Sequence, residues 1–186
     1  MAVPRPQATV STMTDLHADG VWLTPTTIDR LNVEDISGDA LAHALGVAPP
    51  ASWPPQFNGP ETREWMRRML LADARNSGWL GWYVIATLDG VPTLAGTAGY
   101  KGRPDQKGEV EIGYGLAPAY HRRGIATAAA GLLCQRAFKA GATAVLAETL
   151  PDGTASQGVL ANAGFIRTGT RLDPDDGEVW CYRLDR

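Results

Sequence analysis

The segment of residues 109–140 constrains the fold more than any other part of this 186-residue chain. Residues 109–116 alternate charged and apolar side chains, which predicts a strand. After a short loop with two arginines, the apolar period becomes helical from Gly124 onward. The first N–H groups of a helix lack intrahelical partners and carry partial positive charge. Because Gly124 and Ala126 let a ligand approach this backbone closely, the segment predicts a phosphate or pyrophosphate site.

Two other phosphate-binding patterns do not fit these residues. A dinucleotide fingerprint needs three glycines at the turn from strand to helix. Here Gly113 and Gly115 lie inside the predicted strand, and Pro118 stands where the third glycine belongs. A P-loop is excluded because no Gly-Lys-Ser/Thr follows.

Periodicity and turn residues predict further elements along the chain. The expected strands cover 21–23, 82–88, 92–100, 109–116, 144–150, 165–172 and 178–184. Helices are expected over 39–45, from Pro60 to near Gly78, over 124–140 and over 154–163, and Asp89-Gly90 marks a hairpin turn. This order predicts the α/β class, with a mixed sheet flanked by helices.

Composition excludes several kinds of function. The formal net charge is -3 and no basic run is visible, which argues against a nucleic-acid partner. Two distant cysteines and three scattered histidines match no metal-binding spacing, so we expect no metal. No segment has the length or apolarity of a membrane span or a secretion signal, so we expect no membrane contact and a cytoplasmic protein. We expect a flexible N-terminal tail over residues 1–20 and a single domain over residues 21–186.

Two motifs resemble a known family. His121-Arg-Arg-Gly-Ile-Ala126 is similar to the pyrophosphate loop of the GCN5-related N-acetyltransferases (GNAT), R/Q-x-x-G-x-G/A, with His121 at the first position. Residues 155–165 are similar to the second motif of that family, although Gly153 and Leu160 replace its usual Asn and Tyr. The N-terminal half resembles the branch that contains ribosomal-protein N-terminal acetyltransferases.

The resemblance implies acetyl-CoA as the donor and a primary amine, on a small molecule or a protein N-terminus, as the acceptor. It implies a mixed, mostly antiparallel sheet of about seven strands, splayed at the acetyl-CoA site, and a homodimer is carried over as an expectation. The implied acetyl-CoA-binding residues are Leu116, Ala117, Arg122, Arg123, Gly124, Ile125, Ala126 and Thr127. An alternative function is a catalytically reduced module that acts by binding CoA.

Three residues are candidates for the chemistry of direct attack on the thioester. Glu111 and Glu148 lie in apolar strands at positions that match bases of relatives, and the choice between them stays open. Ser156 is the candidate proton donor to the leaving thiolate, although a helix-start hydroxyl also satisfies backbone N–H groups. Trp53, in a Pro-rich loop, is a candidate wall of the acceptor pocket, or else a hydrophobic plug.

Overall fold

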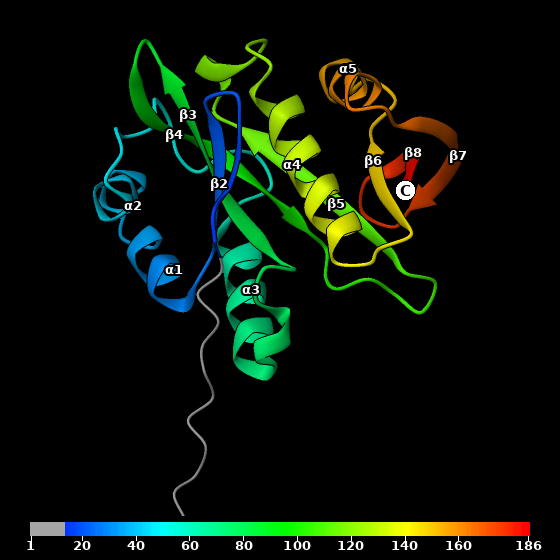
Figure 1. Ribbon diagram of the computed structural model, residues 1–186, viewed down its shortest axis with the longest axis horizontal. Coiled ribbons are helices and arrows are strands. Elements are labelled where there is room, and N and C mark those ends of the chain that lie inside the picture. The colour runs from blue at the N-terminus through cyan, green and yellow to red at the C-terminus, as the bar shows by residue number, and fades with distance from the viewer. Residues whose placement is uncertain (1–13) are drawn as a thin grey trace, which may run out of the picture.

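The computed structural model, which describes residues 14–186, contains an eight-stranded sheet with helices on both faces (Figure 1). The strands are β1 (Leu16–Ala18), β2 (Val21–Pro25), β3 (Gly81–Leu88), β4 (Val91–Tyr100), β5 (Glu109–Leu116), β6 (Ala144–Thr149), β7 (Ile166–Asp173) and β8 (Gly177–Asp185). Their order across the sheet is β1-β2-β3-β4-β5-β6-β8-β7. Neighbouring strands are antiparallel except β5 and β6, which run parallel. The α/β class with a mixed, mostly antiparallel sheet is confirmed.

Alternation along β3 places a separate core on each face of the sheet. The helices are α1 (Ile28–Glu34), α2 (Gly38–Leu45), α3 (Pro60–Ala72), α4 (Ile125–Lys139) and α5 (Thr154–Asn162), with short 3-10 turns at Ala74–Asn76 and Pro118–Tyr120. Trp82 and Val84 pack in the main core with α4. Tyr83 and Ile85 point the other way and pack with α2. The sheet is therefore buried on both sides along its centre.

The hairpin predicted at Asp89-Gly90 is confirmed, and it joins β3 to β4. Both turn residues have positive φ, 50° at Asp89 and 80° at Gly90, as a two-residue turn with the twist of its strands requires.

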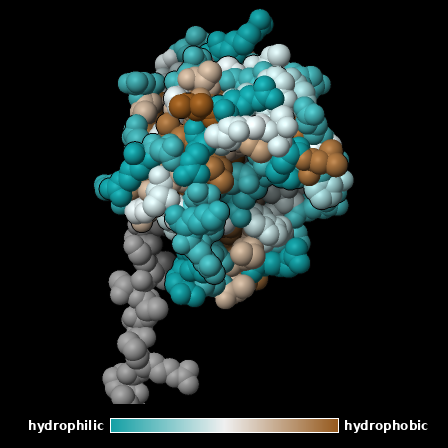
Figure 2. All heavy atoms as spheres, turned by 90° about the vertical axis from the view of Figure 1, so that its right-hand side faces the viewer, coloured by the Kyte–Doolittle hydropathy of each residue, from teal (hydrophilic) through white to brown (hydrophobic). Residues whose placement is uncertain are grey.

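On the side of the molecule that carries α5, β7 and β8, apolar side chains lie in separate groups among hydrophilic ones (Figure 2). This is the ordinary pattern of a protein surface.

The structure corrects the predicted N-terminal tail. Residues 16–18 form β1, which pairs antiparallel with β2 and brings the sheet to eight strands in place of about seven. The hydroxyl of Thr24 donates to Asp15 over 2.6 Å and fastens this segment. A strand of only three residues is too short for an alternating pattern to identify it in the sequence. The first 13 residues of the predicted tail lie outside the described residues.

Two helix predictions also needed correction. The sequence did not predict α1, whose start is capped by the Thr27 side chain accepting from Arg30 N–H. The helix that begins at Pro60 ends at Ala72 and not near Gly78, because Asp73 adopts an extended conformation and a 3-10 turn follows.

Candidate functional site

The strands β5 and β6 separate part-way along their length. Only the first three residues of β5 pair with β6, and the last pair is Glu111 with Leu146. Beyond it, β5 continues to pair with β4 as far as Leu116. The sheet therefore opens between β5 and β6, as expected for a splayed sheet.

This opening leaves backbone groups of β5 without a partner strand. The carbonyl of Glu111 accepts from Lys101 N–H, and Ala117 N–H donates to Ala95, both on the β4 side. Because bonding sides alternate along a strand, the N–H and C=O groups of Tyr114 and Leu116 face the opening. An extended ligand with amide groups can pair with such an edge.

Of the predicted cofactor residues, Ala117 is the one that the structure separates from the rest. Its N–H is used within the sheet, and the residue is fully buried. Leu116 keeps its N–H toward the opening, and its carbonyl accepts from His121 Nε2 at 3.1 Å. His121 thus fastens the loop before α4 to the end of β5.

The remaining predicted cofactor residues line one cavity of about 580 Å³ at the N-terminus of α4. Gly124 is the N-cap, with φ 75° and no side chain to cap the helix, and the first intrahelical bond runs from Ala128 N–H to Gly124. The N–H groups of residues 125–127 therefore have no intrahelical acceptor. With Arg122 and Arg123 also lining it, the cavity has the donors and the charge that a pyrophosphate needs.

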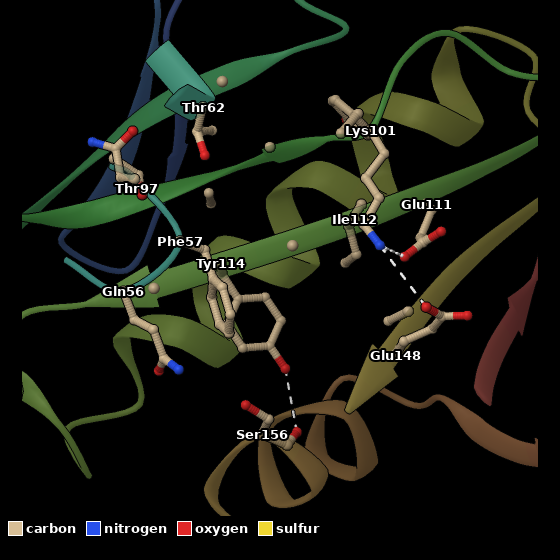
Figure 3. Close-up of a pocket in the computed structure, with 18 of the residues that line it drawn as sticks. Gln56, Phe57, Thr62, Thr97, Lys101, Glu111, Ile112, Tyr114, Glu148 and Ser156 are labelled. Atoms are coloured by element: carbon tan, nitrogen blue, oxygen red, sulfur yellow. Dashed lines mark hydrogen bonds and ion pairs between the residues drawn. The ribbon is translucent and has the colours of Figure 1, made fainter. Parts of the chain in front are cut away.

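A second cavity of about 460 Å³ adjoins the first. The two share the lining residues Gln56, Phe57, Tyr114, Gly115 and Ser156. In the close-up, Lys101, Glu111, Tyr114 and Glu148 are seen around this second cavity, with Gln56 and Phe57 at its other end (Figure 3). The cavity at the helix N-terminus and the cavity with the carboxylates of β5 and β6 are therefore neighbours with a shared wall.

Both predicted base candidates line the second cavity, and Lys101 lies beside them (Figure 3). The Lys101 ammonium contacts a carboxylate oxygen of Glu111 and lies 3.9 Å from Glu148 Oε2. Glu148 is also held by Arg171, whose Nε and Nη2 donate to its two oxygens over 2.5 and 2.6 Å. A bidentate guanidinium stabilises the ionised form and occupies both carboxylate oxygens. Glu111 is therefore the freer of the two carboxylates.

The strand also carries Glu109, on the same face as Glu111 by parity. Its carboxylate accepts from Arg183 Nη1 over 2.7 Å, and Glu109 does not line either cavity. A cross-strand ion pair thus accounts for Glu109, whereas Glu111 lies where the sheet opens.

Ser156 lines both cavities, and so does Tyr114, which the sequence reasoning did not single out. The Tyr114 hydroxyl donates to the Ser156 carbonyl over 3.2 Å (Figure 3). Burial raises the pKa of Tyr114 above its ordinary range, so the phenol keeps its proton at neutral pH. Leu160, where relatives carry a tyrosine, is fully buried. Tyr114 on β5 therefore places an aromatic hydroxyl beside the first turn of α5.

Trp53 does not line either cavity, and its contacts fit the alternative that it is a hydrophobic plug. It packs with Leu41 and Tyr83 on the α2 side of the sheet. Gln56 and Phe57, three and four residues further along the same loop, line the cavities instead. A Pro-rich loop has no regular periodicity, so the sequence does not predict which of its side chains point toward the cavities.

The thiols are not activated as nucleophiles. Cys134 is buried in α4, and burial raises its pKa to about 12. Cys181 lies 3.9 Å from Glu148 Oε1, and partial burial together with this negative charge raises its pKa as well. Both side chains stay protonated at neutral pH, and a thiol is a far weaker nucleophile than a thiolate.

Within residues 14–186, no group of three or more His, Cys, Asp or Glu side chains is placed to hold a metal ion. Over the same residues, none of the helices has the length and apolarity to cross a bilayer.

Comparisons with known proteins point the same way as the geometry. A family model described as an acetyltransferase (GNAT) domain matches residues 28–166. Ribosomal-protein-S5-alanine acetyltransferase from Vibrio fischeri has 16% sequence identity and a TM-score of 0.63, with 93% of this chain and 97% of that chain covered. RimJ from Mycobacterium smegmatis, in complex with CoA-disulfide, has 21% identity and a TM-score of 0.63, with 92% and 86% covered. The microcin C7 self-immunity acetyltransferase MccE, in complex with acetyl-CoA and AMP, has 15% identity and a TM-score of 0.63, with 91% and 94% covered. A comparison with curated protein sequences gave no match.

Proposed function

Because the chain belongs to the GNAT acetyltransferase family, we propose that it transfers the acetyl group of acetyl-CoA to a primary amine by direct attack on the thioester. One observation carries this proposal. A cavity at an uncapped helix N-terminus meets a second cavity lined by carboxylates, and they meet where β5 presents an unpaired backbone edge. The first can hold the donor, the second the acceptor, and the edge can align the thioester between them.

In this proposal the pyrophosphate of acetyl-CoA binds the backbone of residues 122–127, and the two arginines add formal charge. The pantetheine arm pairs with the free N–H and C=O groups of Tyr114, because the Leu116 carbonyl already accepts from His121 Nε2. The Leu116 N–H also supports the oxyanion of the tetrahedral intermediate, and such a donor is typically worth about 3 kcal/mol. Relatives crystallised with CoA or acetyl-CoA support the choice of donor.

The acceptor amine must lose a proton before it can attack. An alkyl amine with a pKa of about 10.4 is neutral in about one molecule in two thousand at pH 7. Glu111 is the proposed base, because it lines the acceptor cavity and its carboxylate is not held by an arginine. Glu148, held by Arg171, is proposed to keep a fixed negative charge that attracts the ammonium form.

In this proposal the CoA thiolate forms between α5 and β5 when the C–S bond breaks. Tyr114 keeps its proton, and its O–H is proposed to turn from the Ser156 carbonyl and donate a hydrogen bond to the thiolate, while the Ser156 hydroxyl assists from the first turn of α5. A thiol with a pKa near 8.5 leaves adequately as a thiolate, so a hydrogen bond from Tyr114 would increase the rate but is not essential for the reaction.

A CoA-release assay over a panel of amines, antibiotics and peptide N-termini tests the proposal. We expect acetyl-CoA binding by calorimetry and amine-dependent release of CoA with at least one class of amine. Tight CoA binding without release on any amine would instead favour a module that acts by binding. Absence of binding at millimolar CoA would overturn both functions.

A further inference from the structure

One lysine already lies in the cavity proposed for the acceptor. Lys101 follows β4 directly, and its backbone N–H bonds to the carbonyl of Glu111 across the sheet. This cross-strand register places the two side chains on one face, where the ammonium contacts the Glu111 carboxylate and lies 3.9 Å from Glu148. In Figure 3, dashed lines run from the lysine nitrogen to both carboxylates.

This is the arrangement that an external amine would need. Its ammonium would contact the base and lie close to a second carboxylate, in the cavity that adjoins the donor cavity. The Lys101 side chain is 59% exposed, so its four-carbon stem is free to change rotamer toward the thioester. A neighbouring primary amine, held by the chain itself, has a much higher effective concentration than one in solution.

We propose that Lys101 is an internal acceptor, and that the protein acetylates this residue when it is given acetyl-CoA without another amine. The inference rests on the proposed function, since it uses the same donor and the same base. It goes further by assigning a modification site and the class of that modification, an N-acetylated lysine.

The step balances without any further reactant. Glu111 takes one proton from the Lys101 ammonium, and the amine nitrogen then attacks the thioester carbonyl carbon. The new C–N bond gives the tetrahedral intermediate, its collapse breaks the C–S bond, and the second proton leaves the nitrogen for the departing thiolate. The products are the Lys101 amide, CoA thiol and the proton on Glu111, which returns to solvent. No atom changes oxidation state.

The modification would change the cavity. Acetylation removes the charge of Lys101, so its ion pair with Glu111 is lost. The carboxylate is then free to contact the ammonium of an external acceptor. Self-acetylation would thus prepare the base for turnover.

The chain contains three lysines, which makes the test simple. Lys107 and Lys139 are both exposed, and neither lines a cavity. The full-length protein is incubated with acetyl-CoA alone, and acetylation is mapped by mass spectrometry of peptides. We expect a mass gain of one acetyl group on Lys101, at a rate independent of protein concentration, with Lys107 and Lys139 acetylated far more slowly. The Glu111→Gln variant should lose the Lys101 product and leave slow acetylation of the other two unchanged.

Equal acetylation of the three lysines, or the same Lys101 product after denaturation of the protein, would overturn the inference, because it would show ordinary chemical acetylation. A rate that rises with protein concentration would also overturn it, since one molecule would then modify another. If external amines are acetylated while Lys101 stays unmodified, the inference fails and the proposed function stands. If no amine at all accepts the acetyl group, both fail together.

Discussion

The indole N–H of Trp53 donates to Oε1 of Glu34 over 3.0 Å. Glu34 is 3% exposed, and the same carboxylate accepts from Asn58 Nδ2 over 2.5 Å and from the Tyr83 hydroxyl over 2.7 Å. Three segments of the chain are thus joined at one buried carboxylate. The loop between Trp53 and Asn58 carries Gln56 and Phe57, two of the five residues that line both cavities, so Glu34 positions part of the cavity wall without lining it.

Replacing Glu34 by alanine should loosen this loop. Loss of the carboxylate leaves the Trp53 and Asn58 donors without their acceptor, and we expect a destabilisation of about 3 kcal/mol. Glu34→Gln is the matched control, since its amide oxygen can accept from both and its NH₂ can donate to the Tyr83 hydroxyl. We expect Glu34→Ala to raise KM for the acceptor more than it lowers CoA affinity, with Glu34→Gln close to wild type. Equal losses of acceptor and CoA binding in Glu34→Ala would contradict this role.

Glu34 also gives stability a pH dependence. Burial is the largest cause of its raised pKa, and the hydrogen bonds from Tyr83, Asn58 and Trp53 oppose it only in part. In the window between the ordinary value of 4.5 and the raised value, the folded protein binds more protons than the unfolded chain. The contribution of this group to the free energy of unfolding is therefore full below pH 4.5 and is lost as the pH rises through the folded pKa. Urea unfolding of wild type and Glu34→Gln at several pH values should show a difference that moves against wild type as the pH rises, and a constant difference would refute the assignment.

Glu111→Gln tests the proposed base. We expect kcat/KM for the best amine to fall by about 100-fold, with CoA affinity unchanged, because general base catalysis typically contributes that much. Glu109→Gln is the control on the same strand, since its carboxylate pairs with Arg183 outside both cavities. A Glu111→Gln enzyme with wild-type kcat/KM across pH 6–9 would remove Glu111 from the mechanism.

Gly113→Val tests where the acceptor binds. Gly113 lines the acceptor cavity, and a Cβ added there meets nothing within 4 Å, so the strand can accept the side chain while the cavity loses volume. We expect KM for the acceptor to rise by about tenfold, which corresponds to about 1.4 kcal/mol, with little change in CoA binding. Gly169→Val in the edge strand β7, where a Cβ also meets nothing, should leave both constants unchanged. An unaltered KM in Gly113→Val would place the acceptor elsewhere.

Removal of the two loop arginines tests the pyrophosphate site. Arg122→Gln combined with Arg123→Gln should weaken CoA binding by about tenfold, as expected for two exposed charges, and the loss should shrink at high salt. Arg68→Gln, on the exposed part of α3, removes a single positive charge outside both cavities and should have no effect. Calorimetry at two salt concentrations gives both results. A double variant that binds CoA as tightly as wild type at low salt would show that the arginines do not contribute.

The sequence pattern was sufficient to predict those features that depend on interactions between residues close together in the chain. The left-handed Gly124 at the start of an Ala-rich helix and the Asp89-Gly90 turn depend on neighbouring residues, because a positive φ and free helical N–H groups follow from a few positions in the chain. The α/β class, the hairpin and the cavity at the start of α4 followed from such signals.

The tertiary structure decided what depends on the packing of distant segments. Alternation marked Glu109 and Glu111 as equivalent, but the pairing of β8 gave Glu109 an arginine, and the end of the β5–β6 pairing left Glu111 in a cavity. In the same way, the loop could present either Trp53 or its neighbours to the sheet, and the buried carboxylate of α1 fixed Trp53 on the far side. The sequence by itself determined which backbone could bind an anion, since that depends on local dihedral angles. Only the folded chain determined which carboxylates line the second cavity and which are held by arginines, because that depends on contacts between residues far apart in the sequence.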